Sequence, residues 1–182
     1  ASNVPFGRYE IYDPNYAKHY GKAPIHDYFF LKSVDKTRPG GLVMHITSTG
    51  TLDKGDPYIR EELAKTCDLV SAVRFPGGAH QANAGTQAVT DMLILRKRLP
   101  SEKPGDQSWL KTTMVKDPDG GEDIPVNQNF ADHPEQILGR LDRSGTMYRA
   151  NNVNVALTDD YEKRLEDAIS RLPEGLYKPH VN

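Results

Sequence analysis

The sequence predicts an α/β fold built on a sheet with parallel strands. The apolar run 42–47 follows an amphipathic segment over 25–37, and the apolar run 68–75 follows a second helical pattern. The last apolar run, 91–96, is preceded only by small and polar residues. Alternating helix and strand are typical of a parallel sheet. A parallel pair needs a helix-length connection, so the last two strands are expected to pair antiparallel.

The first predicted helix follows an irregular loop and ends at a Pro-Gly turn. Residues 8–24 are rich in Tyr, Pro and Gly and show no period, which favours a loop. The helix over 25–37 ends at Arg38-Pro39-Gly40-Gly41, because Pro cannot continue a helix and Gly caps one. The nearly continuous apolar run 42–47 predicts a strand that is buried on both faces.

Asp56 and Pro57 mark the start of the second helix. An Asp can cap a helix whose first position is Pro. The strand 68–75 then ends at a Pro-Gly-Gly turn, and the loop 79–89 leads to the final strand over 91–96. Helix and strand therefore alternate twice before the antiparallel return.

After residue 99 the sequence changes character. We expect residues 1–99 to form the partial α/β domain and 100–182 to form an extended arm, because Pro and Gly interrupt the first part of the latter. Trp109 would anchor this arm in a groove. The arm would close with an amphipathic helix that Thr158 caps and Pro173 ends. The apolar face of that helix comprises Tyr161, Leu165, Ala168, Ile169 and Leu172.

Composition limits the class of protein. The net charge of −2 gives no overall basic surface for nucleic acid. Arg96-Lys97-Arg98 could form a local basic surface, although a solvated strand end is the simpler interpretation. The single Cys67 excludes an intrachain disulfide. No run approaches the roughly 20 apolar residues of a membrane span, and no signal peptide is recognisable. We therefore expect a cytoplasmic protein with no membrane partner.

The histidines predict no metal centre. None has metal-ligand spacing to Cys or to a cluster of carboxylates. His45 lies in the predicted buried strand and is expected to be a packed, neutral residue.

The most informative residues are Asn3-Val4-Pro5-Phe6-Gly7. Their order is similar to the catalytic loop of amino-group methyltransferases, usually [Asn/Asp/Ser]-Pro-Pro-[Tyr/Phe/Trp]. A planar amino group is a poor nucleophile because its lone pair is delocalised. An Asn oxygen and a neighbouring main-chain carbonyl can each accept one of its N–H bonds, and an aromatic ring can stack on a base. The same residues would also form an ordinary turn.

Further blocks in the chain occur in a fixed order after this motif. They are the helix and strand over 28–43, Ile46-Thr47-Ser48-Thr49-Gly50-Thr51-Leu52-Asp53, Val73-Arg74-Phe75-Pro76, Ala82-Asn83-Ala84-Gly85-Thr86, the strand 90–95, and Phe130-Ala131-Asp132-His133-Pro134-Glu135. In this order the chain resembles the C-terminal half of the γ-type N6-adenine DNA methyltransferase domain. This domain occurs in large plasmid- and phage-borne helicase–methyltransferase fusion proteins, and similar segments occur in the modification subunits of type I restriction systems.

The resemblance implies a partial Rossmann-like sheet, S-adenosylmethionine as the cofactor of the complete domain, and methyl transfer to N6 of an adenine flipped out of DNA. It implies that Asn3 and the main chain at Val4 and Pro5 bind the amino group. Phe6 would stack on the adenine. Val4 departs from the Pro that most of the superfamily has there, which puts the stiffness of the loop in doubt.

Other residues could contact a ligand or DNA. Thr47, Ser48 and Thr49 stand at the end of a central strand, where α/β folds place ligand loops, or they are ordinary strand-end hydroxyls. Lys54 and Arg74 could bind DNA phosphate, although surface solvation is the simpler interpretation. The polar loop with His80, Gln81 and Asn83 could contact DNA near the flipped base. The alternative is a surface loop without a role in binding.

The resemblance also implies a missing partner. In the γ order, the glycine-rich loop that binds the cofactor precedes the catalytic loop, and it would therefore lie upstream of residue 1. We expect this chain to be inactive alone, with DNA bound by the full-length parent. Its other partner would be the N-terminal half of the domain or a second copy.

Two alternatives remain open at this stage. The chain could be a non-catalytic docking module for DNA or protein that keeps the methyltransferase architecture, because lost strands would expose a sheet edge and an apolar face. The same motif also serves methyltransferases that act on a glutamine side chain in protein.

Overall fold

The computed structural model describes residues 1–5, 7, 11–19, 21, 23–79, 88–143 and 153–177. Its main sheet has four strands in the order β1-β2-β4-β3. Their bounds are Ser2–Asn3 for β1, Leu42–Ser48 for β2, Cys67–Phe75 for β3 and Thr90–Lys97 for β4. Each strand predicted from the apolar runs is therefore present, within two residues of its expected ends.

The order of the strands confirms the α/β fold. β1 runs parallel to β2, whereas β4 lies between β2 and β3 and runs antiparallel to both. Helix α1 (Ile25–Lys36) connects β1 to β2, so these elements form a β-α-β unit of the kind found in doubly wound sheets. The predicted antiparallel pairing of the last two long strands is confirmed.

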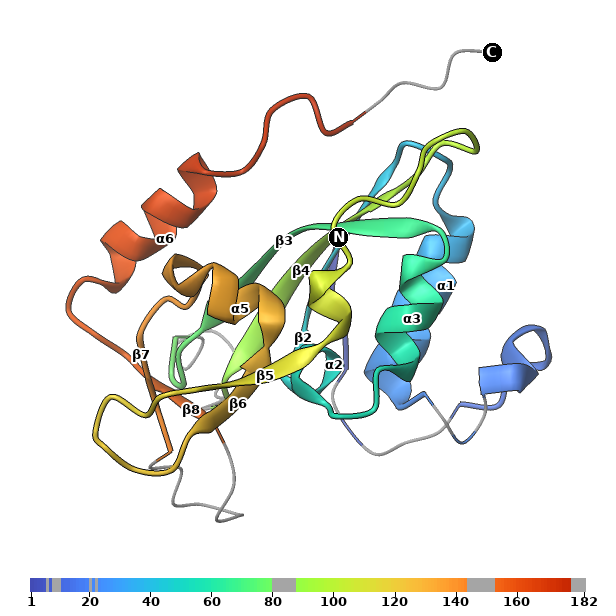
Figure 1. Cartoon of the computed structure of the whole chain (residues 1–182). Helices are drawn as coiled ribbons and strands as arrows, with labels where there is room; N and C mark the ends of the chain where they lie inside the picture. Colours follow the sequence, from blue (N-terminus) through green and yellow to red (C-terminus); the bar gives the residue numbers. More distant parts are fainter. Residues whose placement is uncertain are drawn as a thin grey trace.

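Helices α1 and α3 (Tyr58–Ala64) cover one face of the sheet, and they lie together on that side in Figure 1. Val43 of β2 faces Leu95 of β4 in this core, where both are buried. The turn after α1 needs its glycine: Gly40 has φ of +75° and donates its N–H to the carbonyl of Lys97, 2.7 Å away. The turn therefore closes α1 against the end of β4.

The opposite face is covered only in part. Helix α6 (Tyr161–Ser170) packs against Val73 and Phe75 of β3, on the far side of the sheet from α1 (Figure 1). On β2 the same face carries Leu42 and Met44, which are 39% and 38% exposed. The expectation that β2 is buried on both faces is therefore wrong at these positions, because no described element covers them.

The start of α6 differs from its prediction. The helix follows Asp160, not Thr158, and no side chain caps its first turn. The Thr158 hydroxyl donates instead to the carboxylate of Asp160 at 2.6 Å. The predicted apolar face is confirmed in part: Ala168 is buried and Tyr161 and Leu165 pack against the same cluster, whereas Ile169 is 56% exposed.

The segment after residue 99 has more structure than an extended arm. Its elements are η2 (Ser108–Leu110), β5 (Thr112–Val115), β6 (Ile124–Asn127), α5 (Gln128–Asp132), η3 (Pro134–Gln136), β7 (Arg140–Asp142) and β8 (Asn154–Ala156). Trp109 is 2% exposed and shares one hydrophobic core with α1 and α3, as the anchor prediction requires. Val126 and Phe130 join the same core, so this part of the segment packs on the sheet domain.

Two further short helices lie before α1 and after β2. They are η1 (Pro14–His19), before α1, and α2 (Gly50–Asp53), directly after β2. Within the described part of the chain, no helix has the length and apolar character that crossing a membrane requires.

Candidate functional site

The predicted catalytic loop begins at the carboxyl end of β1. Asn3 pairs with Ile46 in the parallel register, and the N–H of Val4 donates to the carbonyl of Ile46 at 3.1 Å. The Val4 side chain is buried, whereas Asn3 and Pro5 are exposed. Phe6 lies outside the described residues. The loop is therefore anchored at Val4 and presents its neighbours to solvent at the carboxyl edge of the sheet.

The end of β2 and the first turn of α1 meet at this same edge. Ser48 is the last residue of β2, and its hydroxyl oxygen lies 3.5 Å from Nε2 of His26. The connection follows from the topology: β1 and β2 are parallel, so the helix that joins them begins where β1 ends. We call Asn3, Val4, Pro5, Ser48 and His26 the carboxyl-edge site.

A buried polar chain lies beneath this site. Asp27, 2% exposed, accepts a hydrogen bond from the Thr51 hydroxyl at 3.1 Å. The Thr51 hydroxyl also lies 3.1 Å from that of Thr47. Nε2 of His26 is 3.6 Å from Oδ1 of Asp27. The strand-end hydroxyl of Thr47 therefore has a structural partner, while Ser48 faces the histidine.

Burial shifts the pKa values of both members of the His–Asp pair. It raises the pKa of Asp27, and the charge of His26 together with the Thr51 hydrogen bond opposes that rise. It lowers the pKa of His26, against the opposing charge of Asp27 and with a smaller contribution from Lys54. Burial therefore favours a neutral imidazole at this position.

Arg74 is a buried structural residue. Its side chain is 0% exposed, and its Nε and Nη2 donate to the two carboxylate oxygens of Asp91, each at 2.8 Å. Its Nη1 lies 2.8 Å from Asp53, and its guanidinium lies 4.3 Å from the ring centre of Phe130. The structure thus contradicts the assignment of Arg74 to DNA phosphate, because the interior encloses its guanidinium and two carboxylates neutralise it.

Asn127 joins the later segment to the loop after β2. Its side-chain amide donates to the carbonyls of Leu52 at 2.9 Å and Trp109 at 2.8 Å. Its main-chain N–H donates to Oδ1 of Asp53 at 2.8 Å. Asn127 therefore connects α2, which begins two residues after Ser48, to η2 and the end of β6.

The other predicted DNA contacts have different outcomes. Lys54 is exposed and follows α2, close to the carboxyl-edge site, so its contact with DNA stays a prediction. His80, Gln81 and Asn83 lie outside the described residues. His45 is confirmed as a packed residue: it is 5% exposed, its Nε2 lies 2.8 Å from the Ser33 hydroxyl, and burial lowers its pKa.

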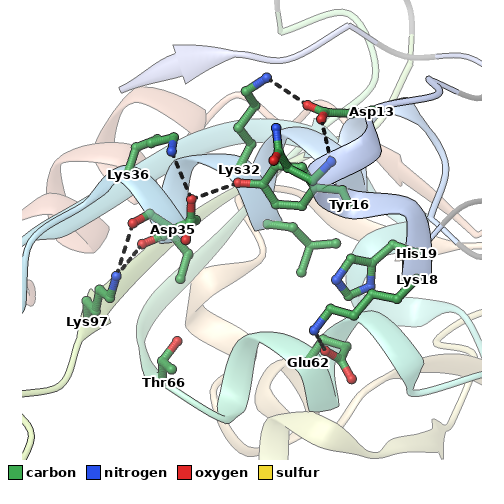
Figure 2. A pocket seen from close by; sticks show the side chains of 13 residues that line it. Asp13, Tyr16, Lys18, His19, Lys32, Asp35, Lys36, Glu62, Thr66 and Lys97 are labelled. Carbon is green, nitrogen blue, oxygen red and sulfur yellow. Dashed lines mark hydrogen bonds and ion pairs between the residues drawn. The ribbon is translucent and has the colours of Figure 1, made fainter.

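A groove of about 540 Å³ lies away from this edge, between η1, α1 and α3 (Figure 2). Its polar side chains mostly satisfy one another: Asp13 accepts from Tyr28 and Lys32, and Asp35 accepts from Tyr16. Lys97 donates to main-chain carbonyls of α1 and the following turn. Because these charged groups pair with one another, the groove does not favour a ligand of either charge.

The described residues do not fit a complete S-adenosylmethionine site. Among the positive-φ glycines, Gly40 lies in the turn after α1, at the opposite edge of the sheet. Gly78 follows β3 at the carboxyl edge, but it lies in a tight turn in which the Ala79 N–H bonds to the Pro76 carbonyl. The acidic side chains near that edge, Asp27, Asp53 and Asp91, are engaged by Thr51 and Arg74. Across the described ranges, no three His, Cys, Asp or Glu side chains gather as metal ligands would.

Sequence reasoning missed the His26–Asp27 pair. The helix over 25–37 was predicted, but its first turn was assigned no role. The available signal was a His-Asp dipeptide where the chain returns from the catalytic loop, at the edge where α/β sheets bind ligands.

Comparisons with known proteins give partial similarities. No protein-family model matches the chain. It is 32% identical over 104 residues to Defense against restriction protein B of Escherichia phage P1, a match over 55% of this chain and 4% of that protein. A solved structure from Listeria monocytogenes, assigned to the class I S-adenosylmethionine-dependent methyltransferases, aligns with a TM-score of 0.46 at 20% identity, over 58% of this chain and 33% of that chain. Function therefore has to be argued from this chain's own residues.

Proposed function

We propose that this chain is the acceptor-binding part of a DNA adenine-N6 methyltransferase, which moves a methyl group from S-adenosylmethionine to a flipped adenine. The observation that carries the proposal is the parallel pairing of β1 with β2. It places Asn3-Val4-Pro5 at the carboxyl edge of an α/β sheet, where such folds bind ligands.

In this proposal the loop binds the amino group of the base. The Asn3 side-chain oxygen and a main-chain carbonyl at Val4 or Pro5 accept its two N–H bonds. Val4 stabilises the loop by a means that Pro lacks, since its N–H bonds to Ile46 and its side chain is buried. The departure from the usual Pro-Pro sequence is therefore compensated by packing and one hydrogen bond.

In this proposal the methyl donor is bound mainly outside these 182 residues, by the N-terminal half of the domain, because the described residues do not fit its site. We propose that this donor-binding part docks along β1 and the open face of β2. β1 is one of the two edge strands of the described sheet, and Leu42 and Met44 lie exposed on its neighbour. A free strand edge beside an apolar face is a typical docking surface.

The test is methyl transfer by the full-length parent, read as N6-methyladenine in DNA by mass spectrometry. Asn3→Ala should lower the rate by about 100-fold or more, since it removes one of the groups that polarise the amino nitrogen. Asn15→Ala, at another exposed Asn, should leave the rate unchanged. An Asn3→Ala enzyme with normal activity would contradict the proposal.

A docking module without catalysis is the second candidate, and the open face of β2 favours it. It predicts tight association with a partner or a second copy while the parent transfers no methyl group. Methyl transfer to a protein glutamine instead of DNA would assign the same loop to the other class of acceptor.

A further inference from the structure

An apolar pocket of about 220 Å³ lies in the segment after residue 99, and the proposed function gives it no role. Most of its lining belongs to the block that begins at Phe130 and ends at Gly139. Ile137 is buried at the pocket, whereas Pro134 is exposed, so the pocket opens to the surface. The hairpin β5–β6 and strand β7 complete the lining with Val115, Val126 and Leu141.

The lining of this pocket is apolar throughout. None of the lining side chains can form a hydrogen bond with a polar ligand. A water molecule needs two to four polar partners to be held in such a space, and protein interiors leave few voids larger than a water molecule. The lining therefore favours an apolar group as the occupant of the pocket.

The volume of the pocket restricts the size of that group. A cavity of about 150 Å³ already binds benzene, whereas sites for drug-sized ligands occupy about 300–1,000 Å³. The pocket, at about 220 Å³, lies between these limits. It can hold one phenyl ring or one branched aliphatic side chain, and it is too small for a nucleoside or for S-adenosylmethionine.

Contacts between the surrounding elements hold the walls of the pocket in place. On one side, Asn129 of α5 donates to Gln136 of η3 at 2.7 Å. On the other side, the ladder between β5 and β6 pairs Val115 with Ile124. The pocket is therefore formed before any ligand binds, which lowers the entropic cost of binding.

The charged side chains beside the pocket are compensated or solvated. Arg140 of β7 pairs with Asp119 in the turn between β5 and β6, and Glu135 of η3 lies 3.6 Å from Arg171. Asp132 is exposed, so water solvates its charge. These surroundings match an uncharged anchor. An apolar pocket with a polar border is typical of sites where a protein partner inserts one large side chain.

We propose that this pocket is a docking site for a polypeptide partner and takes one phenylalanine- or leucine-sized side chain of that partner. The side chain inserts between α5 and the hairpin β5–β6, against Val126 and Ile137. This docking site lies outside the carboxyl-edge site and involves no step of methyl transfer. The inference therefore stands or fails independently of the proposed function.

The first test is methyl NMR of the 182-residue chain during a titration with N-acetylphenylalanine amide, which represents the anchor in a polypeptide. The methyl signals of Val126 and Ile137 should shift and reach saturation. Ile169 and Leu157, which are 56% and 54% exposed outside the pocket, are the matched controls and should not respond.

The second test compares probes and variants. N-acetylalanine amide should bind about 10-fold more weakly or less, because it lacks the ring that the pocket buries. Adenosine should leave the Val126 and Ile137 signals unchanged. Ala131→Leu places a larger side chain on the lining, so it should abolish binding of the phenylalanine probe. Ala17→Leu, at an exposed position of η1, should keep it.

The inference would be overturned if the phenylalanine probe gave no saturable shift, or if it shifted Ile169 and Leu157 equally. Binding of toluene without binding of the phenylalanine probe would assign the pocket to a small molecule instead of a polypeptide. A response to adenosine at the same methyl groups would assign it to a nucleoside. If Ala131→Leu fails to fold, the comparison of the probes on the unmodified chain still decides.

Discussion

At the scale of single residues, Arg74 shows how burial changes the role of a charged side chain. Its neighbours are Asp91 opposite it on β4, Asp53 on α2 and the ring of Phe130 on α5. Although burial alone lowers the pKa of Arg74, the charges of Asp91 and Asp53 raise it above its ordinary value. The residue joins the sheet to the loop after β2 and to the later segment.

Removing this guanidinium should be costly. Arg74→Met leaves two carboxylates that have lost their partner, so the free energy of unfolding should fall by roughly 3–5 kcal/mol in denaturant titrations. Arg164→Ala, which breaks the half-exposed pair with Asp160 on α6, should leave the free energy of unfolding nearly unchanged.

A second variant checks the reason for the loss. Arg74→Met combined with Asp91→Asn should be more stable than Arg74→Met alone, because one buried charge is removed with its partner. If Arg74→Met kept the stability of the unmodified chain, the ion pairs around it would not be stabilising the fold.

At the scale of elements, the two faces of β2 have different surroundings. The face with Val43 and His45 is buried under α1 and α3, whereas the face with Leu42 and Met44 is open. A run of apolar residues indicates that both faces avoid water. The apolar run does not indicate whether the residues that cover each face belong to the same polypeptide.

The Met44→Asp variant should therefore distinguish an effect on folding of the chain from an effect on its assembly with a partner. Because Met44 is 38% exposed, the isolated chain should lose little stability, within about 1 kcal/mol. Binding to the proposed donor-binding part of the parent, measured by ultracentrifugation, should be lost because a carboxylate would enter the proposed apolar interface.

Met114→Asp is the matched control, since Met114 is 56% exposed on β5. It should leave this association intact. Equal binding by the Met44→Asp and Met114→Asp variants would show that the open face of β2 is not the docking surface.

The strands β5 and β6 were not predicted because they have few of the signals that define a strand. Pro125 lies inside β6, and the turn between the strands contains Pro118 and two glycines. Such residues are typical of loops. The pairing is stabilised instead by Ile124 and Val126, which reach the core from alternate positions of β6.

At the scale of the whole molecule, the sheet and the segment after residue 99 share one core. Trp109, Val126 and Phe130 pack in the same cluster as Phe30 of α1 and Leu63 of α3. Asn127 adds a buried hydrogen bond to Leu52 and a part-buried one to Asp53. The division of the chain at residue 99 stays a prediction of domain organisation. Because the core is shared, we expect the two parts to stabilise each other.

The shared core predicts one unfolding transition. Trp109, the single tryptophan, reports on the later segment by fluorescence, while far-ultraviolet circular dichroism reports on the helices of the sheet domain. The two thermal curves should coincide because neither part can lose its packing alone. Two separate midpoints would instead support independent folding of 1–99 and 100–182.

The sequence by itself determined the alternating helices and strands, the antiparallel return and the loop that begins at Asn3. These follow from local periodicity, turn residues and a short motif, all of which are properties of neighbouring residues. Only the tertiary structure decided that Arg74 is internal, that β2 has an open face and that His26 and Asp27 stand beside the loop. Each of these depends on which distant segments meet, and such contacts arise from packing between elements, which no local pattern encodes.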